Sequence, residues 1–113
     1  MSRIYKILAR RDWEAAWNAQ VYEGSELDRA DGFIHFSTAE QAQETASRHF
    51  RGQAGLVVLE VEVDDLGDAL RWEASRGGQL FPHLYGALPA SLVRGVAEAP
   101  LDPDGVPLIG VLP

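Results

Sequence analysis

Residues 56–63 limit the possible folds more than any other part of this 113-residue chain. One face of this stretch is apolar at every alternate position, through Val57, Leu59, Val61 and Val63. The other face begins with two apolar residues and continues with two glutamates. A two-residue period of this kind is typical of a β-strand. We therefore expect a strand with one face in the core throughout and a second face that emerges into solvent halfway along.

A helix is expected soon after the N-terminus. Asp12 can cap a helix that begins at Trp13, because its side chain can accept hydrogen bonds from the free amides of the first turn. Trp13, Ala16 and Trp17 then form an apolar stripe at helical spacing. We expect this stripe to pack on a sheet, with both tryptophans in the core.

A second helix is expected near residue 37, directly after a strand predicted over residues 32–37. The sequence Ser37-Thr38-Ala39-Glu40-Gln41 holds two overlapping capping boxes, which pair the first residue with the fourth and the second with the fifth. One side of the following turns carries mostly small residues, which implies a close approach to the sheet. Gly52 and Gly55 are expected to end this helix.

The remaining segments predict short strands, turns and one polar loop at residues 22–31. In the strand expected over residues 32–37, Ile34 and Phe36 face the core, and His35 shares the opposite face with Ser37. Further strands are expected at residues 4–9, 70–74, 93–97 and 106–112, with a short extended segment at 81–86. Strands with two helices near the front indicate one α+β domain over residues 1–113, built from small mixed or antiparallel sheets.

Composition and charge exclude several classes of protein and site. The chain has no cysteine, which excludes disulfides, cysteine-based zinc sites and a cysteine nucleophile. Its net charge of −7 argues against general nucleic-acid binding. We find neither the apolar core of a signal peptide nor a stretch suited to a membrane span. A cytoplasmic location is therefore expected.

The sequence contains no standard short catalytic motif, such as a Gly-rich phosphate loop or a His-Glu-x-x-His pair. What remains are polar residues among apolar neighbours, namely His35, His83 and Glu73. Histidine and glutamate can transfer protons, and two histidines with a carboxylate can bind a metal. A structural interpretation is the alternative, in which His35 is a hydrogen-bonded core residue and His83 fixes its loop.

Two segments join several uncommon residues in order, Asp31-Gly32-Phe33-Ile34-His35-Phe36-Ser37 and Phe81-Pro82-His83-Leu84-Tyr85-Gly86. With these, the chain resembles a bacterial and plant family catalogued as domain of unknown function 952. The resemblance covers nearly the whole chain. The other positions that carry it are Ile4-Tyr5, Trp13, Tyr22, Ser25-Glu26-Leu27, Gln41, Phe50-Arg51-Gly52, Leu59-Glu60 and Trp72-Glu73.

The resemblance implies a fold like that of the ADP-ribosyltransferases, in which a split pair of small β-sheets grips NAD in a cleft. NAD is thus the cofactor that the resemblance suggests. Lys6 stands where the family usually has a histidine after the tyrosine, and a lysine there can contact a phosphate. His35 and Ser37 would line the nicotinamide side of the cleft.

The resemblance also suggests an acidic residue at the reacting centre. Glu73 would orient the nucleophile or stabilise the positive ribosyl centre that develops as nicotinamide leaves. His83 and Tyr85 are expected at the rim of the same cleft.

Three functions are open at this point. The first is an enzyme that handles NAD or ADP-ribose, with Glu73 and His35 as catalytic residues. The second is a non-catalytic module that binds a nucleotide-like or other small anionic ligand in the same cleft. The third is a metal-dependent enzyme that uses His35, His83 and Glu73. The residues expected to bind the ligand are Lys6, Ser37, His83 and Tyr85.

Overall fold

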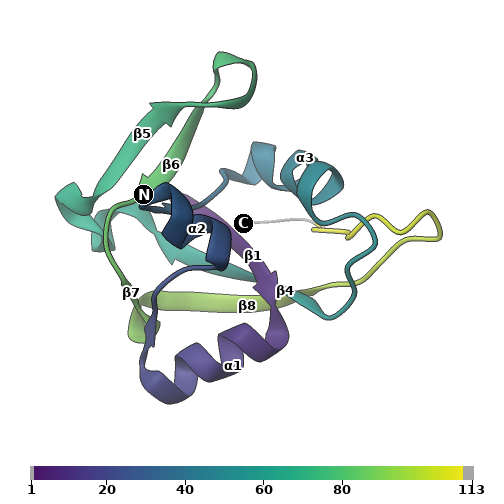
Figure 1. The fold of residues 1–113 in the computed structure, drawn as a ribbon, viewed down its shortest axis with the longest axis horizontal. Coiled ribbons are helices and arrows are strands. Elements are labelled where there is room, and N and C mark those ends of the chain that lie inside the picture. Colours follow the sequence, from purple (N-terminus) through teal and green to yellow (C-terminus); the bar gives the residue numbers. More distant parts are fainter. Residues whose placement is uncertain (1, 111–113) are drawn as a thin grey trace.

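The computed structural model describes residues 2–110. Strand β4 (Leu56–Glu62) lies in the middle of the largest sheet, between β1 (Arg3–Ala9) and β8 (Val93–Ala99) (Figure 1). Both neighbours run antiparallel to β4, so its backbone is hydrogen-bonded on either side. Val57, Leu59 and Val61 are fully buried. The expected strand with one face in the core is confirmed for these three residues, whereas Val63 lies in the turn that follows.

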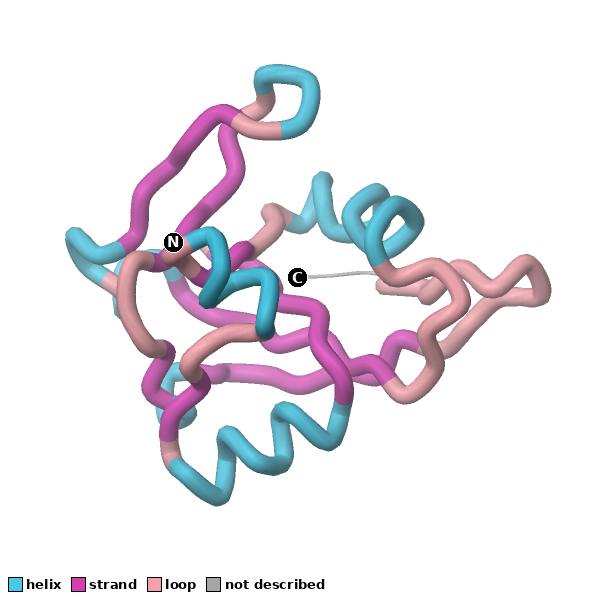
Figure 2. The backbone as a smooth tube through the Cα atoms, viewed as in Figure 1, coloured by secondary structure: helices cyan, strands magenta, loops and turns pink. Residues whose placement is uncertain are grey.

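The two faces of this sheet support two separate cores. Helix α1 (Arg10–Ala19) and helix α3 (Ala39–His49) lie on different sides of β1 and β4 in the tube view (Figure 2). The first core holds Leu59 and its neighbours, and α1 contributes Ala16. The second core holds Val58 and Tyr5, covered by α3. Ala42 and Ala46 of α3 are completely buried, which agrees with the expected close approach of a helix with small residues.

The second face of β4 does not emerge into solvent, so that part of the strand prediction is wrong. Glu62, at the end of the strand, is only 3% exposed. Its carboxylate accepts a hydrogen bond of 2.8 Å from the backbone amide of Ser2 and lies 3.6 Å from Nε of Arg3. Arg3 is the cross-strand partner of Glu62, so the start of β1 and the residue before it cover the carboxylate.

Two smaller sheets complete the strand arrangement, and every strand pair in them is antiparallel. A bridge joins β1 to the segment after β3, since the amides and carbonyls of Tyr5 and Ser37 exchange two hydrogen bonds of 2.8 Å. The expected α+β architecture with small antiparallel sheets is confirmed. One sheet has the order β3 (Ile34–His35), β6 (Leu80–Leu84), β5 (Leu70–Ala74), and the other pairs β2 (Val21–Tyr22) with β7 (Leu88–Pro89).

Helix α1 differs from the prediction at both its start and its exposed side. It begins at Arg10, directly after β1, and Ala9 rather than Asp12 is the N-cap residue. The Arg10 amide is already occupied, because it donates to the carbonyl of Gly55 at 2.8 Å. Trp17 is 51% exposed, so its expected place in the core is wrong. Its ring packs instead beside the ring of Trp13.

A third helix, α2 (Glu26–Asp31), occupies most of the segment that the sequence predicted as a loop. Ser25 caps it, and Asp28 completes a capping box by accepting from the Ser25 amide. Gly32 ends it in the left-handed conformation. The prediction of two helices is therefore wrong, because aspartate at the third helical position was taken as a turn residue.

Helix α3 uses one of its two predicted capping boxes. Thr38 is the N-cap residue and pairs reciprocally with Gln41. The box expected for Ser37 does not form, because the Ser37 hydroxyl lies 2.9 Å from that of Thr45. The helix ends at His49, ahead of the glycines that were expected to stop it.

The strand expected at residues 106–112 is wrong as far as the structure describes it. A single bridge between Leu101 and Pro107 replaces it through residue 110, and residues 111 and 112 lie outside the described part. Proline lacks the amide that a continuous ladder needs. Short 3-10 turns lie at Val63–Asp65, Gly67–Ala69, Arg76–Gly78 and Ala90–Leu92. None of the helices within residues 2–110 has the length and apolar composition required to cross a membrane.

Replacing Leu59 by alanine should lower the free energy of unfolding by about 2–5 kcal/mol, because the side chain is fully buried in the first core. Leu108→Ala removes the same atoms from a side chain that is 44% exposed, and should change stability by no more than about 0.5 kcal/mol. Urea unfolding of both variants measures the difference. Equal effects would contradict the assignment of Leu59 to the core.

Candidate functional site

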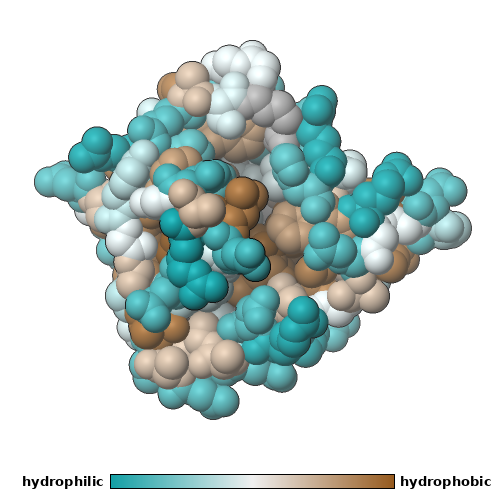
Figure 3. Space-filling model, in the orientation of Figure 1, coloured by the Kyte–Doolittle hydropathy of each residue, from teal (hydrophilic) through white to brown (hydrophobic). Residues whose placement is uncertain are grey.

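A cavity of about 360 Å³ opens on the face of the molecule where α2 and α3 flank β1. Hydrophobic residues are visible in a hollow at this place, between hydrophilic surfaces on either side (Figure 3). Three of the predicted site residues line the cavity, namely Lys6, His35 and Ser37. The other lining residues are Tyr5, Ile7, Ser25, Leu27, Asp28, Phe36, Thr45, His49, Phe50, Ser75 and Phe81.

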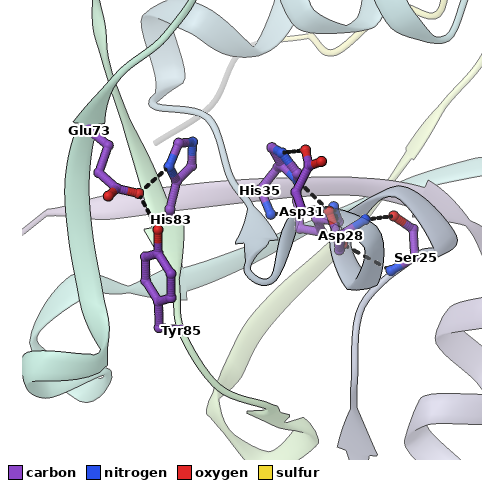
Figure 4. A network of polar contacts seen from close by, with 8 residues as sticks. Ser25, Asp28, Asp31, His35, Glu73, His83 and Tyr85 are labelled. Atoms are coloured by element: carbon purple, nitrogen blue, oxygen red, sulfur yellow. Dashed lines mark hydrogen bonds and ion pairs between the residues drawn. The ribbon is translucent and has the colours of Figure 1, made fainter.

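The buried carboxylate of Asp28 is the polar centre of the cavity wall. Its Oδ2 lies 2.8 Å from Nζ of Lys6 and accepts from the Ser25 amide at 2.9 Å. Its Oδ1 lies 2.6 Å from Nδ1 of His35 and accepts from the backbone amide of the same residue at 3.2 Å (Figure 4). Both carboxylate oxygens are therefore satisfied, which a charge buried to this extent requires.

The charges of Asp28 and Lys6 depend on each other. Burial raises the pKa of Asp28, but the hydrogen bond from His35 and the charge of Lys6 outweigh it and bring the pKa well below its ordinary value. Burial lowers the pKa of Lys6, and the Asp28 carboxylate offsets part of that shift. At neutral pH the two residues form an ion pair, so the charge of Lys6 is compensated inside the protein.

His35 is held at both ring nitrogens. Nδ1 contacts Asp28, and Nε2 lies 3.0 Å from a carboxylate oxygen of Asp31, one turn of helix α2 further along. The side chain of Asp31 is largely exposed, whereas that of Asp28 is buried. Helix α2 thus fixes the imidazole from one side, at the mouth of the cavity.

A second polar cluster lies next to the cavity, on strands β5 and β6 and the residue that follows β6. Oε1 of Glu73 lies 2.7 Å from Nδ1 of His83 and accepts a hydrogen bond of 2.8 Å from the hydroxyl of Tyr85 (Figure 4). Glu73 pairs with Phe81 across the strands, which puts His83, two residues further on, on the same face. The hydrogen bonds from His83 and Tyr85 lower the pKa of Glu73, and the bond to Glu73 raises the pKa of Tyr85.

Phe33 connects the two clusters. Its ring stacks on that of His83 with 4.0 Å between centroids, and it lies 4.6 Å from the ring of His35 and 5.2 Å from that of Tyr85. His35 and His83 are also direct cross-strand partners, with ring centroids 5.4 Å apart. The two imidazoles therefore stand beside each other, each with its Nδ1 on a carboxylate.

The six residues predicted from the sequence fall into two neighbouring groups. Lys6, His35 and Ser37 line the cavity, and the other three, Glu73, His83 and Tyr85, form the cluster beside it. Among residues 2–110, no group of three or more histidine, aspartate or glutamate side chains is placed to hold a metal ion. The geometry thus gives no support to the metal-dependent alternative.

Sequence reasoning missed the residues that organise the site. Asp28 was assigned to a loop and Phe33 received no role, although both are central contacts. The spacing of Ser25 and Asp28 was a usable signal, since it matches a capping box that fixes the start of a helix. The ring nitrogens of His35 contact carboxylates of helix α2, and Nζ of Lys6 contacts the carboxylate of Asp28. A contact of Lys6 with a ligand phosphate stays a prediction.

The comparison with known families agrees with the resemblance seen in the sequence. A family model described as "Protein of unknown function (DUF952)" matches residues 7–96. The chain belongs to this family. No curated protein matches the chain.

Solved structures of one bacterial relative are closely similar to this fold. The crystal structure of protein CC0527 from Caulobacter crescentus is 58% identical, has a TM-score of 0.94, and the match covers 96% of each chain. The solution NMR structure of the same protein has a TM-score of 0.87 at 58% identity, covering 97% of this chain and 95% of that one. The likeness covers nearly the whole chain and concerns its fold. Neither description names an activity.

Asp28→Asn should lower the free energy of unfolding by about 3–5 kcal/mol, because it leaves the ammonium group of Lys6 buried without its counter-charge. Asp31→Asn, at an exposed contact to the same histidine, should cost no more than about 1 kcal/mol. Combining Asp28→Asn with Lys6→Met should recover part of the loss, since neither charge is then buried. Urea unfolding of the unaltered protein, the two single variants and the double variant tests this. A double variant with a lower free energy of unfolding than Asp28→Asn would contradict it.

The free energy of unfolding should fall as the pH falls below about 4. The pKa of Asp28 is lower in the folded protein than in the unfolded chain, so the unfolded state takes up a proton first. Stability contributed by this carboxylate is therefore present above the unfolded pKa and lost as the pH falls toward the folded one. Urea unfolding across this range should show a smaller acid loss for Asp28→Asn, and an unchanged acid loss would refute the attribution to Asp28.

Proposed function

We propose that the chain binds an NAD- or ADP-ribose-like ligand and cleaves or transfers its ADP-ribosyl group. The observation that carries the proposal is that the carboxylate of Glu73 is held in place through one oxygen while the other oxygen is free within the described part of the chain. One of its carboxylate oxygens is fixed by His83 and Tyr85, whereas Oε2 has no hydrogen-bond partner among residues 2–110. The side chain is 37% exposed, so that this second oxygen can meet a ligand.

The charge of Glu73 suits the chemistry of an N-ribosyl bond. When nicotinamide leaves, positive charge develops on the ribose ring, and a fixed carboxylate stabilises that charge in the transition state more than in the ground state. The lowered pKa of Glu73 keeps it ionised at neutral pH. Its two donors hold the carboxylate in place, so little reorganisation is needed when the charge appears.

The surroundings of Glu73 suit the other parts of such a ligand. The rings of Phe33, His83 and Tyr85 form a cluster against which a flat heteroaromatic ring can pack. The guanidinium of Arg71 lies 5.0 Å from the centroid of the Tyr85 ring and is a cation that a phosphate can approach. The small antiparallel sheets are consistent with the ADP-ribosyltransferase-like grouping that the resemblance suggests.

A second candidate is a non-catalytic module that binds a small, mainly apolar ligand. The observation in its favour is that Glu73 does not line the cavity, whose wall is largely apolar around the ion pair of Lys6 and Asp28. In this case the cavity binds a ligand and no bond is broken. Binding without release of nicotinamide distinguishes this candidate from the first.

Glu73→Gln should lower the rate of nicotinamide release from NAD about 10²–10³-fold, because it removes the charge that stabilises the ribosyl centre. Glutamine keeps the size of the side chain and an acceptor for Tyr85, so ligand-induced NMR shifts should persist. Glu44→Gln is the matched control, since Glu44 is an exposed residue of α3 paired only with Arg48 among residues 2–110. Release that is unchanged in Glu73→Gln, or absent in the unaltered protein, would refute the enzymatic proposal.

A further inference from the structure

The two imidazoles at the site differ in how many of their nitrogens are occupied. His35 contacts a carboxylate with each ring nitrogen, at 2.6 Å and 3.0 Å. His83 contacts Glu73 through Nδ1 alone, and its Nε2 has no partner among residues 2–110. Among residues 2–110, Oε1 of Glu62 is the fully buried side-chain polar atom that lacks a hydrogen-bond partner. Nε2 of His83 also lacks a partner there but is not fully buried, so it keeps contact with solvent.

The environment of His83 selects one tautomer of its neutral ring. An ionised carboxylate only accepts hydrogen bonds, so the nitrogen that faces Glu73 must carry a proton. The proton of a neutral ring is then on Nδ1, and Nε2 has a free lone pair. The side chain is 7% exposed and its ring stacks on Phe33, which restricts its rotation.

We propose that Nε2 of His83 is the general base that takes a proton from the attacking nucleophile, so the ADP-ribosyl acceptor is water or an alcohol. This inference rests on the proposed function. Glu73 and His83 then form a unit in which Oε1 of the carboxylate orients the ring and Oε2 faces the ribosyl centre. An oriented imidazole with a free nitrogen is the arrangement that general-base catalysis requires.

The step balances with water as the acceptor. The bond between the ribose C1′ and the pyridinium nitrogen breaks, and its electron pair goes to the ring, which leaves as neutral nicotinamide. A bond forms between C1′ and the water oxygen. The proton of the water passes to Nε2 of His83 and from there to solvent, so the products are ADP-ribose, nicotinamide and one proton. With an alcohol in place of water, the product is the corresponding O-glycoside of ADP-ribose.

His35 does not suit the same role, although it lies directly opposite His83. Both of its nitrogens face carboxylates, so neither presents a lone pair to a nucleophile. Its contact with the exposed Asp31 places it at the cavity mouth as a hydrogen-bond donor. The two histidines therefore allow a comparison between an imidazole with both nitrogens occupied and one whose Nε2 is free within the chain that the structure describes.

The first test needs neither a variant nor a substrate. Long-range proton–nitrogen NMR spectra of the unaltered protein at neutral pH report which ring nitrogen of His83 carries the proton. The expected result is a protonated Nδ1 and an unprotonated Nε2. A proton on Nε2 in the neutral ring would overturn the assignment, even if NAD is cleaved.

The second test uses His83→Asn, whose side-chain amide can still donate to Glu73 while the basic nitrogen is lost. Nicotinamide release in water should fall about 10²–10⁴-fold, with NAD-induced NMR shifts retained. Added azide should restore release in His83→Asn and yield a ribosyl azide, detected by mass spectrometry, because azide has no proton to lose. His35→Asn should show no such recovery.

The outcomes separate this inference from the proposed function. NAD cleavage by the unaltered protein together with undiminished cleavage by His83→Asn would overturn the general base alone. A loss of cleavage that azide does not restore would show that His83 is a positioning residue and would also overturn it. No cleavage by the unaltered protein would overturn the proposed function and the general base together.

Discussion

The buried carboxylate of Asp28 is the constraint on which the local fold and the site both depend. It lies where water cannot solvate it, so the chain must bring enough donors to compensate its charge. These donors come from β1, from the cap of α2 and from β3, through Lys6, Ser25 and His35. Three segments far apart in the sequence are thereby joined at one side chain. Because the same contacts orient His35 at the cavity, a change at Asp28 disturbs both the site and the contact of α2 with β1.

Strand register has a comparable effect on the other half of the site. Pairing of β3 with β6 sets His35 opposite His83, and pairing of β5 with β6 sets Glu73 diagonal to the same histidine. A slip of one residue in either pairing would turn these side chains to the opposite face. Phe33 fills the space between the rings and connects the two clusters. Strand pairing therefore sets the two imidazoles side by side, while carboxylates on α2 occupy both nitrogens of His35 and Glu73 occupies Nδ1 of His83.

The sequence predicted features that follow from the local alternation of apolar and polar residues. It failed where contacts with residues far away in the sequence determine the environment of a side chain. The alternation in β4 predicted a strand with one face in the core, and the same rule placed Ile34 and Phe36 in the core, where both are buried. Glu62 was assigned to solvent because a glutamate at a strand end is normally exposed, but Arg3 and the amide before it cover this one. The role of Asp28 was invisible for the same reason, since its partners lie on other segments. His83 was found through its unusual neighbours in the sequence, although its free nitrogen depends on contacts that only the fold creates.

Lys6, at the position where the resemblance suggests a histidine, affects how a ligand can be recognised. Its ammonium group neutralises Asp28 inside the wall, so it adds no net positive charge to the cavity. A ligand with several phosphates then gains little electrostatic attraction from Lys6. Arg71, beside Tyr85, is a cation near the second cluster that such a ligand can approach. The carboxylates of Glu73 and Asp31 instead favour a positively charged ring, which the aromatic face of Phe33 and Tyr85 can also attract. Under the proposed function, recognition at this site therefore depends more on the cationic N-riboside than on the phosphates attached to it.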